Sequence, residues 1–204
     1  PYSAPAAYYF PVAGRMSGVE VLKGANILRH GPSTVAGVVN LISTRIPDEA
    51  GGQINLEAGE YGSNRVTANY GNGGENWGWL VETHQQESDG FRDIDRSNRD
   101  SGFDIEDYVI KARINSDSQA AIYQQLDIKF QYSEETSDQT YVGLTDADFD
   151  TDVNRLYGLT ELDQMNTRHN GANLRYLVKL NEQLSLTTTA YYNKFKRDWF
   201  KVDK

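Results

Sequence analysis

Apolar and polar residues alternate in seven separate runs of this chain, and that alternation restricts the fold more than any other feature of the sequence. The runs cover residues 53–58, 64–70, 77–85, 108–115, 126–132, 172–180 and 184–195. Successive side chains of a β-strand point to opposite faces, so a period of two predicts strands with one apolar face. The sequence therefore predicts an all-β architecture from residue 51 onward.

The two faces of the predicted strands differ in polarity. In the fourth run, Ile110, Ala112 and Ile114 fall on one face, and Lys111 and Arg113 fall on the other. The second face is also expected to carry Asp127, Lys129, Asn173, Arg175 and Lys179. A dry core could not hold so many charges without partners. We therefore expect this second face to line water and the first face to contact lipid.

The links between the runs alternate in length after the first hairpin. Residues 71–76, 116–120 and 181–183 form short links, whereas 86–107 and 133–170 form long ones. Outer-membrane barrels have tight turns at one rim and large loops at the other. Girdle aromatics are expected at Tyr70, Trp77, Trp79, Tyr108, Tyr132, Tyr176 and Tyr192. Closed bacterial barrels have an even number of strands, so seven predict part of a larger barrel. A soluble β-sandwich is the alternative.

Composition excludes several other classes of protein. The formal charge is −9, which makes nucleic acid a poor partner. No run reaches the roughly 18 apolar residues of a membrane helix. There is no cysteine, and hence no disulfide framework or zinc-thiolate site. Residues 1–5 lack the basic and apolar regions of a signal peptide, so either the protein is not exported or its N-terminus lies upstream.

Residues 1–50 differ in composition from the rest of the chain, with many prolines and short β-branched stretches at 19–22 and 38–42. The stretches 18–24, 28–33 and 35–42 together resemble the final part of the plug domain of TonB-dependent outer-membrane receptors. Within that family, the likeness is greatest to the ferric dicitrate type of siderophore receptor. Residues 1–11, 141–148 and 162–165 add to the resemblance.

The resemblance implies an all-β transmembrane barrel of about 22 antiparallel strands, preceded by part of a mixed α+β plug domain. Residues 1–50 would be the C-terminal part of the plug, and 51–204 the first seven or so barrel strands. The implied function is TonB-dependent transport of a ferric siderophore, of the ferric citrate class, across the outer membrane of a Gram-negative cell. Outer-membrane lipid would be a partner, and TonB would act through an N-terminal part absent from this chain.

Two residues are candidates for ligand binding. If the resemblance holds, the turn at residues 28–34 would stand at the outward apex of the plug. Ferric chelates of the citrate class are anionic, and Arg donates charge-assisted hydrogen bonds to carboxylates. We therefore expect Arg29 and Ser33 to contact the ligand. The alternative is that Arg29 pairs with a nearby plug carboxylate.

The sequence predicts neither an enzyme nor a resident metal or cofactor, and iron would enter only within the transported chelate. No nucleophile, base and orienter stand together, and His30, His84 and His169 show no metal-ligand spacing. Asp150 could open a calcium loop, but the sixth position is Arg155 rather than the required Gly. A solvated acidic loop is the expectation there. The alternative functions are a passive or adhesive outer-membrane barrel protein and a secreted β-sandwich binding module.

Overall fold

The structure is a computed structural model, and it describes residues 11–24, 27 and 37–202. The chain divides into two compact units, residues 1–45 and residues 46–204. In the first unit, a 3-10 turn, η2 (Ala13–Arg15), leads into a hairpin of β1 (Met16–Leu22) and β2 (Val38–Ser43). The two strands pair antiparallel, with Val19 opposite Leu41 and Val21 opposite Val39. They include the two β-branched stretches of the sequence.

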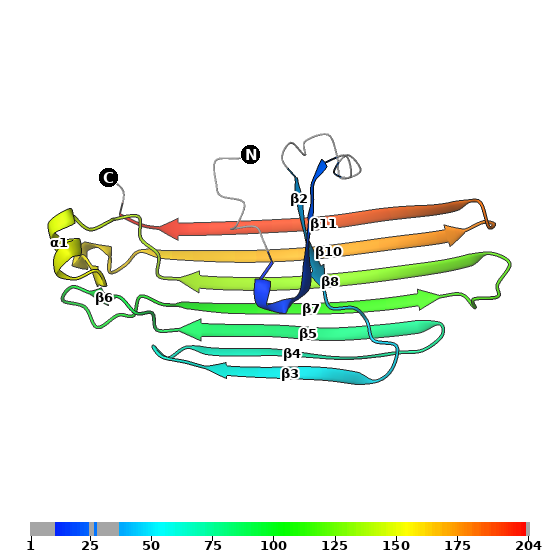
Figure 1. The fold of residues 1–204 in the computed structure, drawn as a ribbon, viewed down its shortest axis with the longest axis horizontal. Coiled ribbons are helices and arrows are strands. Elements are labelled where there is room, and N and C mark those ends of the chain that lie inside the picture. The colour runs from blue at the N-terminus through cyan, green and yellow to red at the C-terminus, as the bar shows by residue number, and fades with distance from the viewer. Residues whose placement is uncertain (1–10, 25–26, 28–36, 203–204) are drawn as a thin grey trace. The chain divides into compact units, whose positions relative to one another are not determined.

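The second unit is built on one antiparallel sheet of seven strands (Figure 1). These are β3 (Gly51–Ala58), β4 (Asn64–Gly73), β5 (Trp77–Ser88), β7 (Phe103–Asn115), β8 (Tyr123–Ser137), β10 (Gln164–Lys179) and β11 (Ser185–Phe200). Each strand pairs with the next one along the chain. The seven predicted strands are thus confirmed, and several extend beyond the predicted ends.

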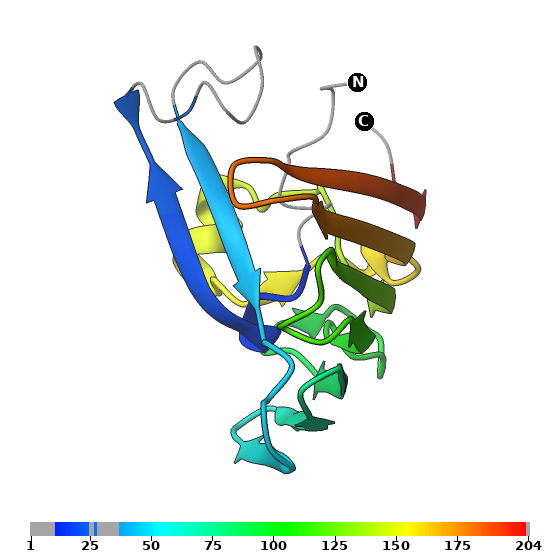
Figure 2. The ribbon, with the colours of Figure 1, turned by 90° about the vertical axis from the view of Figure 1, so that its right-hand side faces the viewer.

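The predicted barrel of about 22 strands with an α+β plug is wrong for this structure. Among the described residues the sheet is open: β3 pairs only with β4, and β11 pairs only with β10. Closure requires the first and last strands of a sheet to hydrogen-bond to each other. Figure 2 shows the seven strands as one layer whose two edges stay apart. The described part of the N-terminal unit is a hairpin with a 3-10 turn and contains no α-helix.

Cross-strand register separates an apolar face of the sheet from a polar one. One row of the apolar face runs across six strands as Tyr70, Val81, Ile110, Phe130, Ala172 and Tyr192. Tyr70, Val81, Ile110, Phe130 and Tyr192 are all exposed, as are Trp77 and Trp79 on the same face. The predicted girdle aromatics therefore share one face of the sheet.

The two ends of the sheet also differ. Short turns at 74–76, 116–122 and 180–184 connect strands at one end. The other end carries the loops 89–102 and 138–163, which lie at the left of Figure 1. Both long loops leave the same end, as the sequence predicts. Both loops are shorter than predicted because the flanking strands extend further.

The two long loops are joined to each other. Two-residue strands β6 (Asp93–Ile94) and β9 (Arg155–Leu156) pair in parallel, and Ile94 and Leu156 are buried. The second loop also holds α1 (Asp146–Thr151) and a 3-10 turn, η4 (Gly158–Thr160). Within the residues that the structure covers, none of the helices has the length and apolar character needed to cross a membrane.

The hairpin between β3 and β4 is shaped by its turn. Tyr61 and Gly62 have φ angles of 58° and 63°. A Cβ atom on Gly62 would also stand 2.1 Å from a carboxylate oxygen of Asp89. Glycine is therefore required at position 62 both for the left-handed backbone and for the close approach of the neighbouring loop.

Candidate functional site

The polar face of the sheet carries a cluster of cations. Lys111 and Lys129 stand directly opposite each other on β7 and β8. In the adjacent row, Arg113, Asp127 and Arg175 follow one another across three strands. Asp127 is the single carboxylate in these two rows, and its Oδ2 lies 3.5 Å from Nη1 of Arg175. The cluster is positive on a chain whose formal charge is −9.

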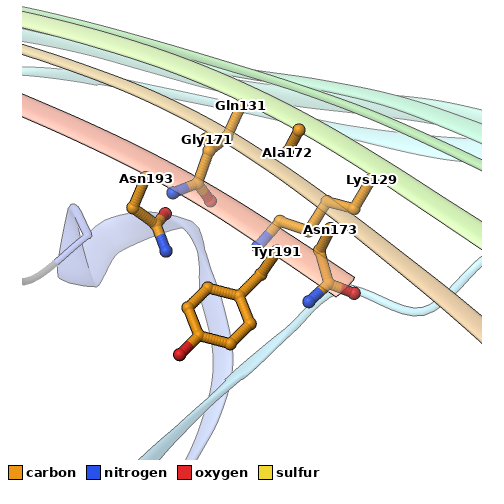
Figure 3. A pocket seen from close by; sticks show the side chains of 7 residues that line it. All are labelled: Lys129, Gln131, Gly171, Ala172, Asn173, Tyr191 and Asn193. Atoms are coloured by element: carbon orange, nitrogen blue, oxygen red, sulfur yellow. The ribbon is translucent and has the colours of Figure 1, made fainter. Parts of the chain in front are cut away.

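A hollow of about 220 Å³ opens beside this cluster (Figure 3). Its lining comes from β8, β10 and β11 and consists of Lys129, Gln131, Gly171, Ala172, Asn173, Tyr191 and Asn193. Register places Lys129, Asn173 and Tyr191 in one row across the sheet. Gln131, Gly171 and Asn193 form the next row. The hollow therefore spans two neighbouring rows of the polar face.

Gly171 shapes the floor of the hollow. A Cβ atom built there would lie 2.7 Å from Cγ and 2.8 Å from Nε2 of Gln131. Only a residue without a side chain allows Gln131 to lie over β10 in this position. Within the described part of the chain, the side chains of Gln131 and Asn173 form no hydrogen bond, while Asn193 Oδ1 lies 3.3 Å from His169 Nε2.

The chemistry of this lining suits oxygen-rich solutes. It offers one ammonium group, three side-chain amides and a phenol, and it contains no carboxylate. Ammonium and amide N–H groups donate to carboxylate and hydroxyl oxygens, and the hydrogen bonds to charged acceptors are the stronger ones. The site has the groups to bind an anion.

A second hollow lies on the apolar face, behind the same part of β10. Its volume is about 360 Å³, and it is bounded by Tyr108, Ile110, Phe130, Tyr132, Ala172 and Tyr192. The small residues Gly171 and Ala172 line both hollows. Its rings and aliphatic groups suit a hydrocarbon rather than a polar ligand.

An ion-pair network holds the two long loops together. The guanidinium of Arg155 donates to both oxygens of Asp95, with Nε–Oδ1 at 2.9 Å and Nη2–Oδ2 at 2.9 Å. Its Nη1 donates to Asp148 at 2.6 Å. Tyr157 Oη also donates to Asp148, at 2.6 Å. One arginine therefore connects α1, β9 and the loop that follows β6.

These contacts change the acidity of the loop carboxyls. The hydrogen bond from Arg155 holds the pKa of Asp95 below its ordinary value of 3.8. Hydrogen bonds from Tyr157 and then Thr145 lower the pKa of Asp148. The same Asp95 contact raises the pKa of Arg155. All three groups are stabilised in their charged forms.

An aromatic cluster lies next to the loops, where β11 ends. The rings of Tyr141 and Trp199 stand 4.5 Å apart, and Nζ of Lys201 lies 3.9 Å from the centre of the Tyr141 ring. Trp199 also donates through Nε1 to the carbonyl of Gln139 at 3.1 Å. The cluster ties the second long loop to the last strand.

The predicted ligand contacts, Arg29 and Ser33, lie outside the described residues, as does His30. His84 is fully buried, with Nδ1 2.8 Å from Thr67 Oγ1. Among the residues the structure covers, no three His, Cys, Asp or Glu side chains gather in a way that could hold a metal ion. The positions of the possible calcium loop do not form one loop: Asp150 lies in α1, Arg155 begins β9, and Glu161 follows η4 and accepts a hydrogen bond from Ser97.

Sequence reasoning missed the hollow itself. The alternation places Lys129 and Asn173 on the polar face, but it does not show that they are neighbours of Tyr191 and Asn193. That proximity depends on the register of three strands. The available signal was Gly171, because glycine inside a strand marks a close approach of another group.

Comparison with known proteins adds no assignment: no protein-family model matches this sequence, and no solved structure matches it significantly.

Proposed function

We propose that this protein resides in the outer membrane of a Gram-negative cell and takes part in TonB-dependent uptake of a ferric siderophore of the ferric citrate class. Its partners would be outer-membrane lipid, the ferric chelate and TonB. The proposal concerns location and transport.

The observation that carries the proposal is the exposed apolar face of the sheet. Trp79, Val81, Ile110, Phe130 and Leu174 are all more than a third exposed and lie on this one face. Large apolar patches on a protein surface mark contact with a partner or a membrane. The backbones of the five inner strands are paired on both sides, as a lipid environment requires, whereas β3 and β11 each pair on one side among the described strands. Strand lengths of 8 to 16 residues fit a tilted crossing of the bilayer.

Two further observations support transport of an anion. In two adjacent rows of the opposite face, Lys111, Arg113, Lys129 and Arg175 surround one carboxylate, Asp127. The strands β1 and β2 coincide with the two strand-forming stretches of the plug-like segment. We propose that Arg29 and Ser33, which lie between these strands in the sequence, contact the chelate.

Iron uptake by whole cells tests the proposal. A strain that lacks its own ferric citrate transport and expresses the full-length protein should accumulate radioactive iron from ferric citrate. The same strain without TonB should not, and fractionation should place the protein in the outer membrane. Uptake without TonB would favour a passive pore. A protein that stays soluble without detergent and imports no iron would be a secreted module, and the proposal would be wrong.

Substitution of Arg29 tests the ligand assignment. Arg29→Ala should weaken binding of ferric citrate by about 1.5 to 3 kcal/mol, the range for a hydrogen bond to a charged group. The amount of folded protein in the outer membrane should not change. A loss of folded protein with unchanged affinity per folded molecule would make Arg29 a structural ion-pair partner instead.

A further inference from the structure

We infer that the hollow on the polar face bounded by Lys129, Asn173 and Tyr191 binds a carboxylate group of a small polycarboxylate anion. This inference deepens the proposed function and rests on it, because it assigns a place in the sheet where an anionic chelate of the citrate class would be held. It concerns a site in the middle of the strands, formed by residues other than Arg29 and Ser33.

The charges around the hollow favour an anion. Lys129 lines it, and Lys111 stands directly opposite Lys129 on the next strand. The carboxylates Glu82, Asp107 and Asp127 on this face lie outside the lining: the first two are buried, and Asp127 is turned toward other groups. Gln125 Nε2 donates to the two oxygens of Asp127 at 2.8 and 3.0 Å, and Arg175 lies 3.5 Å away. A carboxylate entering the hollow would therefore meet cations without a competing anion in its lining.

The hydrogen-bonding groups of the hollow are also suited to carboxylate oxygens. The side-chain amides of Gln131 and Asn173 line the hollow and form no hydrogen bond within the described part of the chain. They come from adjacent rows of β8 and β10, which lie roughly 7 Å apart along a strand. A carboxylate has two acceptor oxygens with about four lone-pair sites, so it can accept from both amides and from Lys129.

The size of the hollow decides how much of a ligand it can take. Its volume of about 220 Å³ is below the roughly 300 to 1,000 Å³ of sites that enclose a whole small molecule. The hollow therefore fits one arm of a polycarboxylate rather than the complete metal chelate. The space depends on Gly171, whose missing Cβ lets the Gln131 side chain lie over β10.

Calorimetric titration of the purified full-length protein in detergent, with iron-free citrate as the probe, tests the inference. Lys129→Gln should weaken citrate binding at least about tenfold, because it removes a charged donor. Lys179→Gln makes the same charge change on the same face, but its ammonium lies over the Tyr123 ring, 5.2 Å from the ring centre, and outside the hollow. This control should bind citrate as the native protein does.

Two further measurements keep the test decisive if Lys129→Gln fails to fold. Asn173→Asp is nearly isosteric and places a carboxylate in the hollow, so it should abolish citrate binding while leaving the detergent-solubilised fold unchanged. A neutral sugar of similar size should not bind to the native protein. Equal binding of the sugar and citrate, or unchanged citrate affinity in both variants, would overturn the assignment.

The failure of this site can be distinguished from failure of the transport proposal. If cells import ferric citrate but the variants bind citrate normally, the subsite is wrong and transport stands. If citrate binds and the variants lose it, but no cell imports ferric citrate, the subsite stands and the transport proposal is wrong.

Discussion

The two faces of the seven-stranded sheet share one backbone but offer their surroundings opposite chemistry. Ile110 and its cross-strand neighbours Val81 and Phe130 expose aliphatic and aromatic groups. At the adjacent positions of β7 and β8, Lys111 and Lys129 present ammonium groups to the other face. If water covered both faces of a single sheet, collecting the apolar side chains on one face would not stabilise the fold.

The contrast shows which face must be covered by an apolar environment. Each Å² of apolar surface removed from water stabilises a protein by about 25 cal/mol, so an uncovered apolar face is a cost to the folded state in water. The polar face differs, because it exposes charged side chains such as Arg175 and buries Leu80, Val109, Glu82 and Asp107. The following predictions test whether the two faces really lie in different solvents.

The largest effect is expected from a charge placed on the apolar face. Ile110→Arg should lower the free energy of unfolding by about 2 to 4 kcal/mol when the protein is in lipid vesicles, because Ile110 lies near the middle of β7. The matched control, Arg175→Ile on the polar face, should change it by only about 0.5 kcal/mol. Urea titration in vesicles measures both. If Ile110→Arg left the free energy of unfolding unchanged, this face would contact water.

Thiol labelling gives a second comparison of the faces at adjacent positions of β10. Leu174 and Arg175 are both exposed in the structure and lie on opposite faces of the sheet. In outer-membrane vesicles, a cysteine at 175 should react with a charged maleimide at least about tenfold faster than a cysteine at 174, which lipid would shield. Equal rates at the two positions would contradict a lipid-covered face.

The two long loops should not show this difference between faces, because ion pairs rather than lipid hold these loops together. Arg155→Ala removes the contacts to Asp95 and Asp148. It should increase protease cleavage within 89–102 and 138–163 severalfold and leave the strands protected. Arg92→Ala, which removes an exposed loop arginine over Phe91, is the control. Unchanged cleavage in Arg155→Ala would show that β6 and β9 suffice to join the loops.

The smallest effect is expected from acid. The pKa values of Asp95 and Asp148 are lowered by their hydrogen bonds, so their contribution to stability is complete above the ordinary value of 3.8 and is lost as the pH falls through the lowered values. Hydrogen exchange in the loops should therefore be constant, after correction for its intrinsic pH dependence, down to about pH 5 and should rise relative to the strands only below 3.8. Loosening that begins near neutral pH would point to other groups.

Sequence alone was sufficient for the strands and for the direction in which their side chains point. The alternation of Ile110, Lys111 and Ala112 depends only on the pleat of one strand, and the structure places all three as predicted. Strand ends were harder. β10 begins at Gln164, eight residues before the predicted start. The sequence did not predict residues 164–171 as strand because they are mostly polar and lack alternation. Hydrogen bonds to β8 and β11 hold this stretch in the sheet instead.

The tertiary structure alone decided whether the sheet closes, which loops touch and where the polar hollow lies. An alternating pattern is the same in an open sheet and in a barrel, because closure depends on pairing between strands far apart in sequence. The contact of Arg155 with Asp95 spans 60 residues, and the hollow needs Lys129, Asn173 and Tyr191 in one register. Side-chain direction is a local property that sequence encodes directly, whereas these contacts depend on how separate segments are aligned after they fold.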